Sequence, residues 1–292
     1  MLDERALAFA CEGETLVGIL SPAAAPARRG VLVIVGGPQY RAGSHRQFAL
    51  LARRLAAQGI PALRFDYRGL GDSTGAARTF EDVAADIRSA IDAFQAAVPG
   101  LQEVVLWGLC DAAAAALAYG QHDRRVAGLV LLNPWARSAA GLARSTLKHY
   151  YWARLRDPAL WRKLARGQFA LGASLRSLLG LVGAARQAPA PAPAALPVLA
   201  RDGSAPPLTP DLHARLLVGM RGFQGRVLFI FSSADLTAQE FLDMCKASPG
   251  WQRLLAQPTV QQHTLDGADH TFSRRAWRDQ VADWTGAWVA AW

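Results

Sequence analysis

The stretch that decides the fold is Val104-Val105-Leu106-Trp107-Gly108-Leu109-Cys110-Asp111-Ala112, which is followed by alanines through Ala116. The apolar run predicts a buried strand, and the alanine-rich run after it predicts a helix. Cys110 lies at the turn between them, with a small residue two positions away on each side. Larger side chains there would collide with the strand or the helix, so the pattern predicts a nucleophile elbow with cysteine in place of serine. The alternative is that Cys110 is a small buried apolar residue, as many unpaired cysteines are.

Predicted strands alternate with predicted helices along most of the chain. This alternation favours an α/β fold with a mostly parallel sheet that is covered by helices on both faces. The first two strands are expected to form an antiparallel hairpin around Glu12-Gly13. We also expect Ser44 and Gln47 to form a capping box at the start of one helix, and Thr79 to cap another. The expected strands lie at residues 4–10, 14–20, 31–35, 61–66, 104–109, 126–132, 226–231 and 259–265.

Length and charge divide the chain into a core and an insertion. A chain of 292 residues with 51% hydrophobic residues suggests one large domain, or a core that carries an insertion. Residues 137–219 contain twelve Lys and Arg against three Asp and Glu, whereas the rest of the chain holds twenty of each. The whole net charge of +9 therefore belongs to this segment. We assign 1–136 and 220–292 to the core and 137–219 to the insertion.

An elbow nucleophile needs a base, and the base needs an acid to orient it. Asp235 follows the strand predicted at 226–231, and His270 follows the last predicted strand. The order nucleophile, acid, histidine is the one expected for this strand–helix architecture. We therefore predict a catalytic triad of Cys110, Asp235 and His270. Asp235 has an alternative role as a helix N-cap.

The predicted chemistry is the attack of a thiolate on an acyl carbon. An unperturbed thiol with a pKa of about 8.5 is only slightly ionised at neutral pH, and a nearby imidazole favours the thiolate. The oxyanion would be held by the backbone N–H of Asp111 and by one from the loop after residue 35. Because Pro38 has no N–H, we assign the second donor to Gln39, with Tyr40 as the other option.

Other candidate positions surround this predicted site. We assign Tyr40, His45 and Trp135 to substrate binding, although His45 has an alternative place on the exposed surface. The three cysteines have no metal-type spacing, and the glycines after residue 66 do not form a G-x-G-x-x-G motif. We therefore expect no metal and no cofactor.

A longer motif connects the chain to a known family. Arg64-Phe65-Asp66-Tyr67-Arg68-Gly69-Leu70-Gly71-Asp72-Ser73 resembles the D-x-R-G-x-G-x-S signature after the fourth strand of alpha/beta-hydrolases. With the elbow, Asp235 and His270, this resemblance spans the chain outside 137–219 and implies the alpha/beta-hydrolase fold. It also implies that Asp66 and Arg68 tie loops together, and that the insertion forms a helical lid. The cysteine departs from the serine majority and resembles the dienelactone-hydrolase branch.

A closer resemblance rests on three stretches around the predicted site. They are similar to exosortase A system-associated hydrolases, bacterial proteins encoded beside exopolysaccharide and protein-sorting machinery. The resemblance implies a setting and does not name a substrate. The stretches are Gly36-Gly37-Pro38-Gln39-Tyr40-Arg41-Ala42-Gly43-Ser44-His45, Gly108-Leu109-Cys110-Asp111-Ala112-Ala113 and Gly267-Ala268-Asp269-His270-Thr271-Phe272.

The basic insertion bears on partners and location. Its mixture of aromatic and cationic residues would suit a small or carrier-bound acyl substrate with an anionic group, or contact with an anionic membrane surface. A solvated amphipathic helix explains the same pattern. We do not expect nucleic-acid binding, because the basic residues would lie over the pocket mouth. Few cysteines and an N-terminus unlike a secretory signal favour the cytoplasm, with peripheral contact at the inner membrane as an option.

Three functions remain open from sequence. The first is a cofactor-independent hydrolase that cleaves an ester or thioester through an acyl-enzyme. The second is an acyltransferase that uses the same triad, and the third is a non-catalytic scaffold for a polysaccharide or sorting assembly. The sequence gives no oligomeric state.

Overall fold

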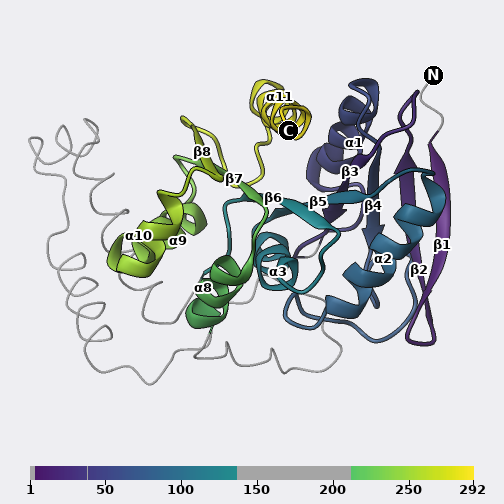
Figure 1. Ribbon diagram of the computed structural model, residues 1–292, viewed down its shortest axis with the longest axis horizontal. Helices are drawn as coiled ribbons and strands as arrows, with labels where there is room; N and C mark the ends of the chain where they lie inside the picture. Colours follow the sequence, from purple (N-terminus) through teal and green to yellow (C-terminus); the bar gives the residue numbers. More distant parts are fainter. Residues whose placement is uncertain (1–3, 38, 137–211) are drawn as a thin grey trace, which may run out of the picture.

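The elbow strand lies near the middle of one large sheet. The computed structural model describes residues 4–37, 39–136 and 212–292, and these residues form an eight-stranded sheet in the order β1-β2-β4-β3-β5-β6-β7-β8 (Figure 1). All eight expected strands are present. Their bounds are β1 Arg5–Cys11, β2 Glu14–Ser21, β3 Arg29–Ile34, β4 Ala62–Asp66, β5 Glu103–Leu109, β6 Val126–Leu132, β7 Arg226–Ser232 and β8 Val260–Leu265.

The sheet is mostly parallel, as the alternation of strands and helices predicted. β1 and β2 form the antiparallel hairpin, and β2 also pairs antiparallel with β4. From β4 through β3, β5, β6 and β7 to β8, neighbouring strands are parallel. The carboxyl ends of β5, β6, β7 and β8 therefore lie along the same edge, where the loops after them can meet. The architecture is that of an alpha/beta-hydrolase.

Helices cover both faces of the sheet and enclose two cores. In Figure 1, α1 and α11 lie on one face, whereas α2, α3, α8, α9 and α10 lie on the other. Strands such as β3, β5 and β6 are buried on both faces, which explains their continuous apolar sequences. The helices are α1 Gln47–Ala57, α2 Ala84–Ala97, α3 Asp111–Gly120, α8 Leu212–Gly222, α9 Leu236–Ala247, α10 Pro249–Leu255 and α11 Arg275–Ala290.

Two predicted helix starts are wrong. Ser44 lies in a 3-10 turn, and α1 begins only at Gln47, after Arg46 adopts a left-handed conformation with φ 61°. The Ser44 N–H donates to the side chain of Gln39. Ser44 is therefore part of the loop before α1, and it does not form a capping box at the start of the helix. Similarly, Thr79 accepts a turn hydrogen bond from the N–H of Asp82, and α2 begins at Ala84.

The two family residues Asp66 and Arg68 hold loops together, as the resemblance implied. The Asp66 carboxylate accepts the Arg41 N–H at 2.6 Å and contacts the Arg41 guanidinium, which also pairs with Asp72. Arg68 pairs with the buried Asp86 at 2.8 Å. These contacts join the loops after β3 and β4 to each other and to α2.

Part of the predicted insertion can be placed. Residues 212–219 belong to α8, which packs closely on α3: a Cβ at Gly219 would come within 2.6 Å of the Leu117 carbonyl oxygen. Residues 137–211 lie outside the described part of the chain, so the boundaries of the insertion and its lid stay predictions. Among the described helices, none has the length and apolar character needed to cross a membrane.

A carboxylate after α3 provides a test of the fold's electrostatics. Asp123 is almost completely buried, and it accepts hydrogen bonds from Tyr119 and Arg125. Burial alone would raise the pKa of Asp123, but the Arg125 contacts outweigh it and lower the pKa to about 2. A lowered pKa stabilises the folded state above the unfolded value near 4, and this stability is lost as the pH falls toward 2.

We therefore predict that Asp123→Asn lowers the free energy of unfolding at pH 7 by about 1 to 2 kcal/mol. Urea titrations of both proteins between pH 7 and pH 3 measure the difference, which should shrink below pH 4. An equal difference at both ends of this range would show that the charge of Asp123 does not contribute.

Candidate active site

Cys110 occupies the strained position that the sequence predicted. It connects β5 to α3 with φ 64° and ψ −121°, a conformation that L residues rarely adopt. Its N–H donates to the Leu132 carbonyl at 2.9 Å, and its own carbonyl accepts the Trp135 N–H at 3.0 Å. Main-chain bonds to the end of β6 and the loop after it therefore hold the turn that carries the half-buried thiol.

The geometry explains why small residues flank the cysteine. A Cβ at Gly108 would lie 2.5 Å from the carbonyl carbon and oxygen of Ala112, which is closer than real Cβ atoms approach backbone. The first turn of α3 thus passes directly over the end of β5. The requirement for a small residue comes from this close approach.

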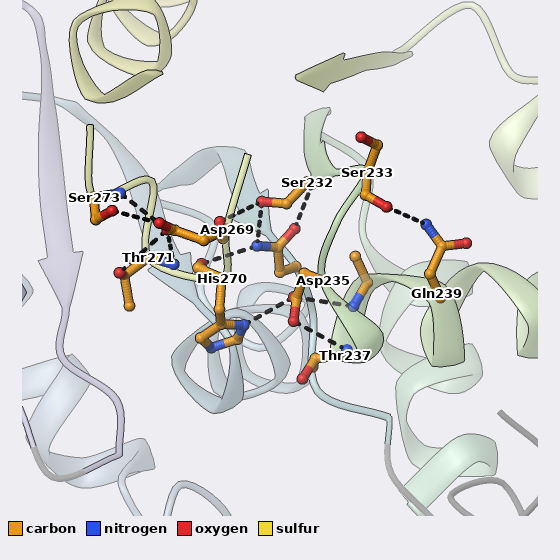
Figure 2. A network of polar contacts seen from close by, with 11 residues as sticks. Ser232, Ser233, Asp235, Thr237, Gln239, Asp269, His270, Thr271 and Ser273 are labelled. Carbon is orange, nitrogen blue, oxygen red and sulfur yellow. Dashed lines mark hydrogen bonds and ion pairs between the residues drawn. The ribbon is translucent and has the colours of Figure 1, made fainter. Parts of the chain in front are cut away.

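Asp235 and His270 form the predicted acid–histidine pair. Asp235 follows β7, His270 follows β8, and the distance from Asp235 Oδ2 to His270 Nδ1 is 2.8 Å (Figure 2). The second ring nitrogen of His270 faces away from Asp235 in this view.

Asp235 is the helix N-cap that the sequence offered as its alternative role, and it contacts His270 at the same time. Its two carboxylate oxygens accept the N–H groups of Thr237 and Ala238 at 3.2 Å, so it caps α9 at the same time as it binds His270. The carboxylate is 8% exposed and is held at both ends. An acid fixed in this way orients the imidazole without moving itself.

The loop that carries His270 is organised by the preceding residue. Asp269 Oδ1 accepts the N–H groups of Thr271 and Ser273 at 3.2 and 3.0 Å, and the Ser273 hydroxyl also binds this carboxylate (Figure 2). Burial would raise the pKa of Asp269, but these hydrogen bonds lower it overall. Phe272, with φ 51° and a buried ring, anchors the loop in the core beneath α11.

Sequence reasoning missed a buried polar network at the ends of β6 and β7. The Asn133 amide donates to the His270 carbonyl at 3.0 Å and to the Ser232 hydroxyl at 2.9 Å. The same side chain accepts the Ser232 N–H at 2.8 Å, and the Ser232 hydroxyl donates to the Asp269 carbonyl. Asn133 therefore positions the histidine loop through its main chain. The available signal was a polar residue directly after an apolar strand at the sheet's carboxyl edge.

The predicted oxyanion donors lie beside an unexpected carboxylate. The side chain of Asp111 accepts the Gly37 N–H at 2.8 Å and the Ala112 N–H at 2.9 Å. Burial raises the pKa of Asp111, while the N–H groups of Gly37, Ala112 and Asp111 itself, together with His270, oppose the rise. The Gln39 N–H donates to the Gly36 carbonyl across 3.4 Å. Pro38 lies outside the described residues, and the roles of Asp111 and Gln39 as donors stay predictions.

The three residues assigned to substrate binding lie in different environments. Tyr40 is 53% exposed, two residues after Pro38. His45 is also exposed, with φ 53°, in the turn before α1. Trp135 is partly buried and packs against the core on the α2–α3 face of the sheet. Their assignment to substrate binding stays a prediction.

Metal ligands and the two cysteines other than Cys110 complete the candidate residues. Within the part of the chain that the structure describes, no group of three or more His, Cys, Asp or Glu residues is placed to hold a metal ion. Cys11 and Cys245 are buried, and burial raises the pKa of both thiols, that of Cys245 to about 12. They are poor nucleophiles for this reason.

Comparisons with known proteins agree with the fold. Residues 26–208 match the family described as Serine aminopeptidase, S33, a range that includes Cys110 and ends before Asp235. A search of curated proteins found no significant match.

Solved structures with the same fold include two esterases and a dienelactone hydrolase. The esterase Pf2001 of Pyrococcus furiosus is 13% identical with a TM-score of 0.64, over all of this chain and 91% of that chain. A dienelactone hydrolase from Anabaena variabilis is 13% identical with a TM-score of 0.60, over 100% and 98% of the two chains. The esterase domain of a Rhodothermus marinus protein is 18% identical with a TM-score of 0.58, over 98% of each chain. At these identities the likeness shows the fold alone.

The double role of Asp235 can be separated by substitution. Asparagine caps helices as well as aspartate does, but it cannot stabilise an imidazolium. We predict that the free energy of unfolding of Asp235→Asn stays within about 0.5 kcal/mol of that of the parent protein. In contrast, kcat/KM for an activated ester should fall about 10²- to 10⁴-fold. Asp235→Ala should lose the same activity and also about 1 kcal/mol of stability.

Steady-state kinetics and urea unfolding of both variants measure these effects. Full activity of Asp235→Asn would show that the carboxylate serves the helix and not the histidine.

Proposed function

Because the chain belongs to the serine aminopeptidase S33 family of alpha/beta-hydrolases, and is therefore a hydrolase, we propose that it cleaves an ester or thioester through an acyl-enzyme on Cys110. His270 serves as the acid and base, and Asp235 orients it. The observation that carries this proposal is the Asp235–His270 contact of 2.8 Å, on strand ends at the same edge of the sheet as the strained Cys110 turn. The description of the family names a serine, whereas this chain has a cysteine at position 110. The proposal of a cysteine nucleophile therefore comes from this chain's own sequence.

Acylation begins with a thiolate and an imidazolium. The Cys110 sulfur attacks the acyl carbon, and the electron pair of the carbonyl bond moves to its oxygen. When this oxyanion collapses, the bond to the leaving group breaks and His270 gives its proton to the departing oxygen or sulfur. Asp235 stabilises the positive charge on the ring until the proton is transferred.

Deacylation reverses these roles. Neutral His270 takes a proton from water, and the resulting hydroxide attacks the acyl carbon of the thioester. The carbon–sulfur bond then breaks, which releases the carboxylic acid and restores the thiolate and the imidazolium. An alcohol in place of water would give acyl transfer by the same steps.

Substrate and setting form the finer part of the proposal. The excess of Lys and Arg in residues 137–219 supports an acyl group on an anionic carrier, or work beside an anionic membrane surface in the cytoplasm. The motifs shared with exosortase A system-associated hydrolases support an exopolysaccharide context. Both ideas depend on sequence patterns.

Thiol labelling tests whether Cys110 is activated. We predict that iodoacetamide modifies the folded protein at one site, Cys110, because Cys11 and Cys245 are buried and burial raises the pKa of both. Replacing the imidazole in His270→Ala should slow this labelling at pH 7 by about tenfold or more, since the thiol then returns toward its ordinary pKa of about 8.5. Intact-mass measurement over time follows the reaction.

Slow labelling shared among all three cysteines, with no effect of His270→Ala, would favour the scaffold interpretation. The variant Cys110→Ala is the matched control, because it retains the two buried thiols and should show no fast phase.

Acylation tests the reaction itself. We predict that an activated short-chain ester or thioester adds one acyl group to Cys110 and that this adduct disappears with turnover. Product analysis with an added alcohol then distinguishes the free acid of hydrolysis from the ester of acyl transfer. A wild-type protein that is alkylated rapidly but never acylated would rule out both enzymatic functions.

A further inference from the structure

The side chain of Asp111 lies where loop and helix meet behind the nucleophile. One carboxylate oxygen accepts the N–H of Gly37 at 2.8 Å, and the other accepts the N–H of Ala112 at 2.9 Å. Gly37 belongs to the loop after β3, whereas Ala112 belongs to the first turn of α3. The carboxylate is therefore a bridge between two segments that are far apart in sequence.

The bridge fills a space that is shaped for it. A Cβ at Gly36 would lie 2.0 Å from Asp111 Oδ1 and 2.9 Å from the Ala112 nitrogen. Gly36 must therefore lack a side chain so that the carboxylate can reach the loop. Burial raises the pKa of Asp111, and the convergent N–H groups oppose the rise, as expected for a carboxylate that is held by backbone donors.

A second carboxylate holds the same loop at its other end. Asp66 accepts the Arg41 N–H at 2.6 Å and contacts the Arg41 guanidinium. Between these two attachments lies Gln39, whose N–H is the predicted second oxyanion donor and, without substrate, faces the Gly36 carbonyl at 3.4 Å. Asp111 and Asp66 therefore hold the loop on both sides of this predicted donor.

We propose that the Asp111 side chain is a positioning residue that aligns the loop after β3 for oxyanion binding during acylation of Cys110. This inference rests on the proposed function. It concerns the carboxylate of Asp111, in addition to the backbone N–H that the same residue offers. The side chain neither touches the acyl group nor exchanges a proton with it.

The proposal separates two reactions of the same sulfur. Attack on an ester places negative charge on the carbonyl oxygen, so its rate depends on the aligned N–H donors. Alkylation by iodoacetamide displaces iodide from a saturated carbon and develops no oxyanion. Loss of the bridge should therefore slow acylation but not alkylation.

The experiment compares both rates for the wild-type protein, Asp111→Ala and Asp111→Asn. A misplacement of about 1 Å can slow a reaction about 100-fold, and we expect a loss of this order for the alanine variant. Asparagine retains one acceptor oxygen, so the acylation rate of Asp111→Asn should fall only about tenfold, which is a partial rescue. Alkylation should stay equal or rise slightly in both variants, because removal of a negative charge near the sulfur favours the thiolate.

Asp123→Asn is the matched control, since it removes a buried carboxylate at the other end of α3. It should lower stability and leave both rates unchanged. Protection of Cys11 and Cys245 from iodoacetamide reports that each variant is folded during the assay.

The outcomes are distinguishable. If wild-type protein is acylated and both Asp111 variants match it, the inference is wrong and the proposed function stands. If acylation and alkylation fall together, Asp111 acts on the sulfur or on folding, and the positioning role is again wrong. If wild-type protein is alkylated but not acylated, the proposed function itself fails.

Discussion

The close packing of the first turn of α3 over the end of β5 is the constraint on which the site depends. The approach of Ala112 to Gly108 leaves no room for a side chain at Gly108, and Cys110 between them has a positive φ. The same packing accompanies the contact between the start of α3 and the loop after β3. The contacts of Asp111 follow from the same approach, because only a helix this close allows its carboxylate to reach Gly37.

Parallel strand order supplies the rest of the site. Cys110, Asn133, Asp235 and His270 follow four neighbouring strands, β5 to β8, so that their loops share one edge of the sheet. Each loop is held by polar contacts that are independent of any substrate. Asp235 caps a helix while it binds the imidazole, and Asn133 joins its own loop to the carbonyl of His270. Preorganisation of this kind avoids the reorganisation that water would require during the reaction.

The sequence predicted what depends on periodicity and on short motifs. Every strand of the described sheet was found. Central strands such as β3, β5 and β6 are continuous apolar runs, β1 and β2 flank the turn at Glu12-Gly13, and the elbow was found from Gly108 and Ala112. The starts of α1 and α2 were misplaced, since Ser44 and Thr79 form hydrogen bonds within the loops before these helices instead of capping them. The network of Asn133 and the bridge of Asp111 were missed for a similar reason. Each joins segments that lie apart in sequence, and a lone Asn or Asp after a strand has many other uses.

The order of the strands also has a consequence for biosynthesis. The ribosome releases the cysteine with β5 well before it releases β7 and β8, which carry the carboxylate and the imidazole. On the proposed chemistry, a nascent chain therefore holds an ordinary thiol with a pKa of about 8.5. The thiol becomes a strong nucleophile only when β7 and β8 have docked. Incomplete chains therefore react slowly with acyl donors in the cell.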